Sequence, residues 1–298
     1  MPAIVLEASD FSSPLFLVRS CEVLFSCTTF SLVTALESSE LTKNPLHLQH
    51  LPTIKIFCIF TWCFFFTVTL LIHLLSTIQF HSLLPVSWKN LTVTVAVLGS
   101  LMCLSASVFF PWLIMERQKA WPRPAAAAVT SVLTFLAYVS ESYVLNSQVQ
   151  EQKGFMGSLP GLLKIVQLWG SFHVIPLFVE EDHGLSNGFH RWQPWVSGTS
   201  YGVCILMSLV TMVVIWGEFA GRCCLPFDRL MLGFTIIGLL LYMVATVICF
   251  NKLLKLINSE NKSSELVIME VVVAFITLLS YTVDLTFSIK VLCDRSHT

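Results

Sequence analysis

The sequence predicts an all-α, polytopic integral membrane protein whose eight transmembrane helices form two tandem four-helix bundles. Hydrophobic residues make up 55% of the chain and charged residues 12%, about half the roughly 25% of an ordinary soluble domain. The mean hydropathy is +0.77. Eight apolar runs are long enough to cross about 30 Å of hydrocarbon. Polar residues of the first four runs recur in the last four, which predicts the duplication.

The eight runs are each predicted to be a helix, because an isolated strand cannot satisfy its backbone in lipid. The first and third runs end before the polar joints "ESSELTKNPLHLQHLP" and "MERQKAWPRP". The fifth and sixth end before "EEDHGLSNGFHRWQP" and "GRCCLPFDRL". No joint can hold a folded soluble domain, so the protein is expected to act within the membrane or at its faces. The predicted spans are 15–36, 54–75, 91–112, 125–145, 159–179, 195–217, 230–250 and 266–289.

An internal repeat relates the two halves. The fourth run contains "TFLAYVSE" (134–141), and the eighth contains "TLLSYTVD" (277–284), 143 residues later. In the first run Arg19, Glu22 and Ser26 have the spacing that Lys164, Gln167 and Ser171 repeat 145 residues on. Thr69 with Thr211, and Ala106 with Ala245, are looser echoes. Because four is an even number, both halves enter from the same side, which counts against inverted-repeat transporter architectures.

The predicted organisation has five parts. The N-terminal segment lacks a basic region and a small-residue cleavage pattern, so the first helix is expected to remain in the mature protein. The parts are a tail (1–14), a first four-helix module (15–145), a linker (146–158), a second four-helix module (159–292) and a short C-terminal tail (293–298).

Two intramembrane ion pairs are predicted, Arg19 with Glu141 and Lys164 with Asp284. Each acid follows a Thr and a Tyr at i, i+4, i+7 spacing, so all three lie on one helix face. Each base lies near the start of its module, at the depth where the acid's helix ends. An unpaired charge costs roughly 2.5 to 3.5 kcal/mol at a helix centre, and pairing offsets much of this. Glu22 is expected to share Arg19.

A proton or ion path is the alternative function for these acids, because intramembrane ionisable residues are functional candidates. His73 and His173 would extend such a path. The structural role is favoured, because the charges gather near one face and form no ladder across the bilayer.

The cysteines divide into two groups. Seven lie inside apolar runs, where cysteine behaves as a small hydrophobe, so no disulfide framework is predicted. Cys223, Cys224 and Cys293 lie just past the ends of apolar runs, where reversible S-palmitoylation occurs; unmodified thiols are the alternative. "GRCCLPFDRL" is either a tight joint between two helices or an acylated anchor.

No catalytic, cofactor-binding or metal-binding residues are predicted, and no cofactor. The sequence has no zinc or di-iron ligand spacing, no GxSxG and no P-loop, so an enzyme is not expected. A net charge of -1 offers no basic surface for nucleic acid. Glycosylation motifs occur at Asn90 and Asn261, on opposite membrane sides, so at most one is usable. The Lys and Arg residues are balanced between the two sides and do not set the orientation.

The stretches "FTWCFFFTVTL" (60–70), "CLSASVFFP" (103–111), "SLPGLLKIVQ" (158–167) and "LPFDRL" (225–230) resemble the myeloid-associated differentiation marker family. The resemblance spans about 15–292 and implies two tandem MARVEL domains, which are tetraspan modules of cholesterol-rich membrane, vesicle trafficking and cell junctions. It also implies cytoplasmic termini and no catalytic residues. The three candidate acylation cysteines would then be cytoplasmic, and Asn261 extracytoplasmic.

The expected function is non-enzymatic organisation or sorting of membrane. The expected partners are membrane lipids, including cholesterol-rich ordered domains, other membrane or cortical proteins, and a second copy of the chain. The expected location is the plasma membrane or trafficking vesicles. Aromatic residues near helix ends fit interfacial anchoring. The alternatives are an ion or proton channel or transporter, and a subunit that chaperones another membrane protein.

Overall fold

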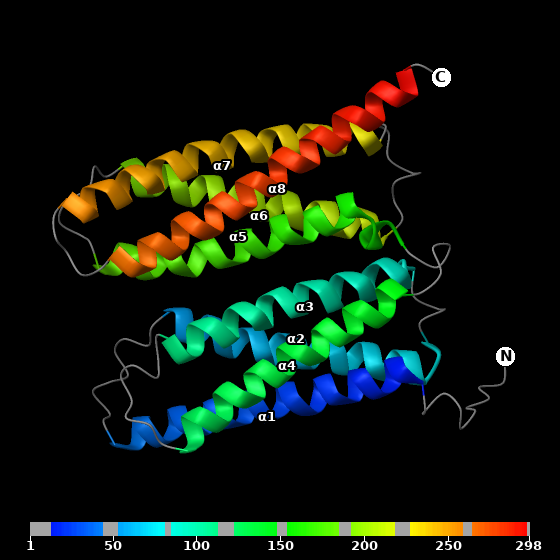
Figure 1. The fold of residues 1–298 in the computed structure, drawn as a ribbon, viewed down its shortest axis with the longest axis vertical. Coiled ribbons are helices and arrows are strands. Elements are labelled where there is room, and N and C mark those ends of the chain that lie inside the picture. The colour runs from blue at the N-terminus through cyan, green and yellow to red at the C-terminus, as the bar shows by residue number, and fades with distance from the viewer. Residues whose placement is uncertain are drawn as a thin grey trace. The chain divides into compact units, whose positions relative to one another are not determined.

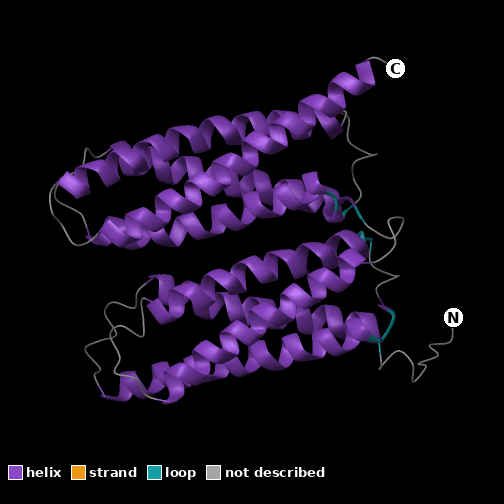
Figure 2. Cartoon of the chain, in the orientation of Figure 1, coloured by secondary structure: helices purple, strands orange, loops and turns teal. Residues whose placement is uncertain are grey.

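The computed structural model is all-helical and divides into two compact units, Met1–Gly157 and Ser158–Thr298. Its described residues contain eight long α-helices and one short 3-10 helix, and no strand occurs among them (Figure 2). The predicted fold class is therefore confirmed. The described residues are 13–43, 53–80, 85–112, 122–147, 154–184, 192–217, 227–258 and 264–296.

The first unit is a four-helix bundle. Consecutive helices pack against each other, and the fourth packs against the first, so the bundle closes into a ring (Figure 1). This arrangement places the N-terminal part of the first helix beside the C-terminal part of the fourth. The helices are α1 (Pro14–Lys43), α2 (Thr53–Thr77), α3 (Trp88–Phe110) and α4 (Pro122–Ser147).

The second unit repeats the arrangement of the first. Its consecutive helices are in contact, and its last helix packs along its first (Figure 1). The helices are α5 (Leu159–Gly184), α6 (Trp192–Trp216), α7 (Phe227–Asn258) and α8 (Ser264–Ser296).

A serine precedes and caps the first helix of each unit. The Phe16 N–H donates to Ser13 Oγ at 3.2 Å, and the Gly161 N–H donates to Ser158 Oγ at 3.5 Å. A serine in this position satisfies a backbone donor that the helix leaves open. The two serines are 145 residues apart, the offset that also separates Arg19 from Lys164. The duplication therefore includes the start of each bundle.

Two segments expected to connect or trail the modules carry helical structure. The short helix η6 (Phe155–Gly157) lies against α3, and the Met156 N–H donates to Asn90 Oδ1 at 3.1 Å. The end of the expected 146–158 linker thus belongs to the first unit, because the buried Met156 side chain anchors it. Helix α8 continues to Ser296, so Cys293 lies on a helix.

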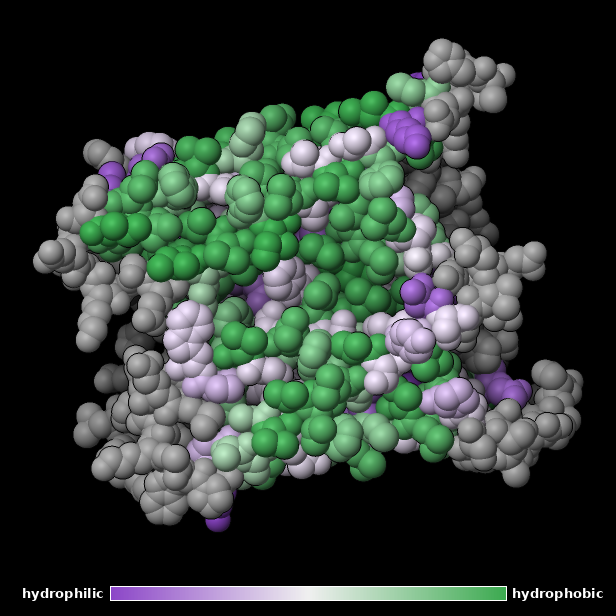
Figure 3. Space-filling model, viewed as in Figure 1, coloured by the Kyte–Doolittle hydropathy of each residue, from purple (hydrophilic) through white to green (hydrophobic). Residues whose placement is uncertain are grey.

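All eight long helices are long and apolar enough to cross a membrane. Their outward side chains are mostly apolar, as Figure 3 shows for one face. Exposed hydroxyl groups in these spans donate to backbone carbonyls of their own helix. Thr28 donates to Leu24 O at 2.7 Å, and Thr282 donates to Leu278 O at 2.9 Å. A hydroxyl in lipid has no water to bond, so this arrangement suits a surface that faces hydrocarbon.

Candidate functional site

The first unit holds a buried ion pair between its first and last helices. Arg19 Nε lies 2.6 Å from Glu141 Oε1, and both side chains are less than 5% exposed. Arg19 Nη1 also donates to Ser76 Oγ of α2 at 3.3 Å. The guanidinium therefore joins α1 to α4 and α2 at once.

The second unit holds the corresponding pair with more hydrogen bonds. Lys164 Nζ lies 2.6 Å from Asp284 Oδ2 and donates to Thr235 Oγ1 at 2.8 Å. Asp284 Oδ2 also accepts from Thr235 Oγ1 at 2.9 Å and from Gln167 Nε2 at 3.1 Å. A buried charge is tolerated when its partners satisfy it, and three donors meet this carboxylate. The cluster joins α5, α7 and α8.

Glu22 interacts with Arg19 through charge alone and makes no hydrogen bond to it. Its side chain is 0% exposed, and neither carboxyl oxygen has a hydrogen-bond partner. The Arg19 Nε–H is taken by Glu141, which leaves Glu22 buried beside the pair.

A tyrosine follows the same geometry in each unit. The Tyr138 hydroxyl lies 2.7 Å from Thr69 Oγ1 and donates to Phe65 O at 3.2 Å, so it ties α4 to α2. The Tyr281 hydroxyl lies 3.5 Å from Ser208 Oγ and links α8 to α6. Both tyrosines are buried. Each unit thus carries one ionic and one hydroxyl contact on the same stripe of its last helix.

Two glycines lie directly under these tyrosines and were missed from the sequence. A Cβ built on Gly99 would lie 2.8 Å from Tyr138 Cδ1, and one built on Gly238 would clash with the Tyr281 ring. The two glycines are 139 residues apart, the offset between Ala106 and Ala245. Comparing the residues two helical turns before Ala106 and Ala245 would have identified both glycines.

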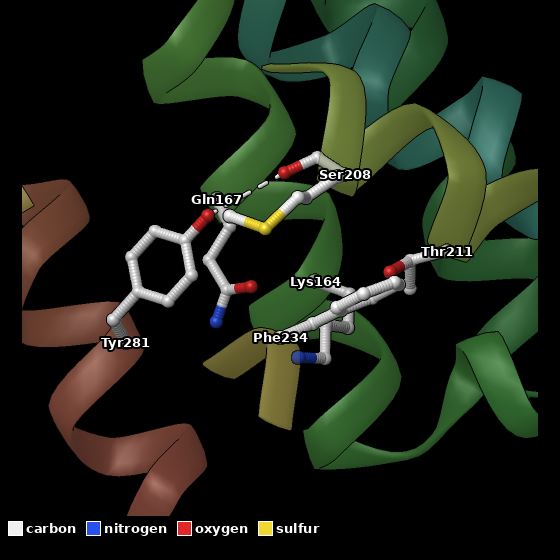
Figure 4. A pocket seen from close by; sticks show the side chains of 7 residues that line it. Lys164, Gln167, Ser208, Thr211, Phe234 and Tyr281 are labelled. Atoms are coloured by element: carbon white, nitrogen blue, oxygen red, sulfur yellow. Dashed lines mark hydrogen bonds between the residues drawn. The ribbon is translucent and has the colours of Figure 1, made fainter. Parts of the chain in front are cut away.

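A narrow polar recess opens beside the second ion pair. Figure 4 shows it between α5, α6, α7 and α8, with the Tyr281 and Ser208 hydroxyls directed toward each other. It has room for about one water molecule. Its lining residues are Lys164, Gln167, Met207, Ser208, Thr211, Phe234 and Tyr281.

The two intramembrane histidines have local contacts. His73 Nε2 lies 3.3 Å from Ser20 Oγ, and its ring lies 4.6 Å from that of Phe16. His173 is fully buried, and its Nδ1 lies 2.9 Å from the Trp169 carbonyl of its own helix. These contacts fit packing of the helices in which the histidines lie.

The candidate modification sites are described only in part. Cys293 is exposed near the end of α8, whereas Cys223, Cys224 and Asn261 lie outside the described residues. Asn90 is 7% exposed, donates to Ser87 Oγ at 3.0 Å and accepts from Met156 N. An amide held in this way is not presented for glycosylation.

A further buried acid escaped the sequence reasoning. Glu270 on α8 is 2% exposed, and its Oε1 accepts from the Tyr201 hydroxyl at 3.5 Å. It lies one helical turn from the start of the span, where an acid is easily taken for an interfacial residue. Within the described ranges, no three His, Cys, Asp or Glu side chains gather closely enough to hold a metal ion.

The chain is similar to curated proteins over most of its length. A myeloid-associated differentiation marker homolog of Xenopus laevis is 32% identical over 82% of this chain and 76% of its own. Myeloid-associated differentiation marker-like protein 2 of Mus musculus is 30% identical over 96% and 94%. Myeloid-associated differentiation marker of Homo sapiens is 26% identical over 83% and 73%. No protein-family model and no solved structure matches the chain.

Proposed function

The chain belongs to the myeloid-associated differentiation marker family, and from this premise we propose that it is a non-enzymatic multi-pass protein that organises or sorts membrane. In this proposal each unit is a MARVEL-like tetraspan module. The protein partitions into cholesterol-rich ordered domains of the plasma membrane or of trafficking vesicles. Its partners are lipids, other membrane or cortical proteins, and a second copy of itself.

One observation carries this proposal: both units turn their charged pairs inward and present apolar side chains outward. Arg19, Glu141, Lys164 and Asp284 are each at most 6% exposed. Large apolar side chains on the outer faces are about half exposed, including Leu71 in the first unit and Val247 in the second. The surface available for recognition is therefore lipid-facing, which suits a protein whose binding is to membrane.

Partition into ordered lipid tests the proposal. Purified full-length protein is placed in phase-separated giant vesicles, with cysteines 223, 224 and 293 changed together to Ser in one variant. We expect the wild type to favour the ordered phase and the variant to shift toward the disordered phase, because an acyl chain packs well among ordered lipids. The matched control changes Cys21, Cys27 and Cys63, which lie within helices. Equal partition of all three proteins would contradict the role of acylation, and exclusion of the wild type would contradict the proposed function.

Ion or proton flux through liposomes tests the rival function. A membrane organiser predicts no flux above that of empty liposomes. A flux that is lost when Glu141 or Asp284 is neutralised would replace the proposed function with a channel or transporter. Co-purification of one stoichiometric membrane protein would instead favour a chaperoning subunit.

A further inference from the structure

Glu22 poses an electrostatic problem in the first unit. The carboxyl group is fully buried on α1, one turn after Arg19 and beside Glu141, and its two oxygens have no hydrogen-bond partner. Arg19 and Glu141 already neutralise each other across 2.6 Å. An ionised Glu22 would therefore give the buried cluster a net negative charge.

The cost of that charge is large compared with the cost of a neutral acid. Removing an ion from water into a protein interior costs several kcal/mol, even after local relaxation. A second carboxylate beside the first adds repulsion, and two close carboxyl groups commonly share one proton for this reason. A protonated carboxyl group avoids both costs and supplies an O–H donor that the ionised form lacks.

The residue that corresponds to Glu22 in the second unit is a neutral hydrogen-bond donor. Gln167 occupies the place of Glu22 in the repeat, 145 residues on, and is also buried. Its amide donates to Asp284 Oδ2, the carboxylate of that unit's ion pair, at 3.1 Å. A glutamine and a protonated glutamate have nearly the same shape, and both are neutral with one donor available toward the neighbouring acid.

From the full burial of Glu22 one turn from Arg19 of the Arg19–Glu141 pair, with neither of its oxygens hydrogen-bonded, we infer that Glu22 is a proton-binding site, held as a neutral carboxylic acid. The bound ligand is a single proton, and the cluster of Arg19, Glu141 and protonated Glu22 is electrically neutral. The titratable groups around the site are Arg19 and Cys21 on its own helix, Glu141 and Tyr138 on α4, and Cys103 on α3, with His73 of α2 facing Arg19.

This inference is independent of the proposed function. A membrane organiser can carry a structural proton, and a proton-conducting protein would require an exchangeable one. The first unit therefore has a protonatable position that the second lacks, since a glutamine side chain binds no proton near neutral pH.

Infrared difference spectroscopy on the purified full chain tests the inference. A protonated carboxyl group has a carbonyl stretching band that a carboxylate and an amide lack. At neutral pH we expect the wild-type spectrum to contain a band that disappears in Glu22→Gln. The reciprocal variant Gln167→Glu is the matched control and should gain a second such band, because it rebuilds the first unit's cluster in the second. Glu270 contributes equally to all three proteins and cancels in the differences.

The melting temperature in detergent shows whether Glu22→Gln folds as stably as the wild type. Glu22→Gln should retain the wild-type melting temperature, because the amide reproduces the shape and neutrality of the protonated acid. Identical infrared spectra for the wild type and Glu22→Gln would overturn the inference. Loss of folding in Glu22→Gln would also overturn it, since an ionised Glu22 is the state that an amide cannot replace.

Discussion

At the scale of single residues, the two ion pairs join the same helices of each unit but differ in how they are satisfied. Lys164 and Asp284 share Thr235, and Gln167 also donates to the acid. Arg19 has Glu141 and one longer bond to Ser76. Removing one member of a buried pair costs about 3 to 5 kcal/mol, because the other charge is left unpaired.

A charge exchange at the second pair tests its structural role. We expect Lys164→Asp and Asp284→Lys each to abolish delivery to the cell surface, because each places two like charges in contact. The double variant should restore much of the delivery, since it recreates an opposite pair between α5 and α8. Surface biotinylation measures the outcome. Normal delivery of both single variants would show that the pair does not hold the bundle together.

The two glycines under the tyrosines permit a second test. Gly99→Ala and Gly238→Ala should each lower the melting temperature, because the new methyl group displaces a buried ring; overpacking typically costs about 1 to 3 kcal/mol. Gly202→Ala is the matched control, since its Cβ would have no neighbour within 4 Å. It should be neutral or slightly stabilising, because alanine favours helix. Equal effects at all three positions would indicate that helix propensity, and not the contact with the ring, decides the result.

At the scale of helices, each last helix is the common partner within its bundle. Helix α4 contacts α1 through Glu141 and α2 through Tyr138, and α8 contacts α5 through Asp284 and α6 through Tyr281. These polar contacts matter in a membrane, where lipid tails are as apolar as leucine and exert little hydrophobic force between helices.

Removing the tyrosine hydroxyls should affect the two units unequally. Tyr138→Phe keeps the ring and removes a bond of 2.7 Å, so we expect a loss of about 1 kcal/mol. Tyr281→Phe removes a contact of 3.5 Å and should cost about a few tenths of a kcal/mol. Melting curves of the two variants in the same detergent compare these costs. A larger effect at Tyr281 would contradict the difference in geometry.

At the scale of the whole molecule, the chain consists of two bundles that each contain their own ion pair and tyrosine contact. Because each unit closes into its own ring of four helices, we expect the fragments 1–157 and 158–298 to insert and fold when expressed separately. Protease resistance and helix content in detergent would measure this. Fragments that are degraded when separate but stable when expressed together would show that the units depend on each other.

Much of this architecture could be predicted from the sequence because it depends on composition and spacing. The apolar runs identify the spans, and the repeated Thr-Tyr-acid stripe identifies the helix faces where Glu141 and Asp284 meet Arg19 and Lys164. Those contacts follow from the repeat because opposite charges at one depth in a membrane have few other partners.

Other features depend on details that spacing does not determine. Whether Glu22 contacts Arg19 depends on the direction of the guanidinium, which turns to Glu141 and Ser76. The role of Gly99 depends on the size of the ring above it, and glycine is common in membrane helices for many reasons. The anchoring of Met156 on α3 depends on a long-range contact that no local pattern records.

The separation of the paired charges along the chain has a consequence for biosynthesis. Arg19 is 122 residues from Glu141, and Lys164 is 120 residues from Asp284. At about 5 to 20 residues per second, a ribosome needs on the order of ten seconds to make the missing partner. During that interval the first helix of each unit carries a base without the acid that later binds it, which costs free energy in lipid. Only completion of the fourth helix supplies the acid that binds this base, so a unit truncated before that helix lacks the ionic contact that closes its bundle.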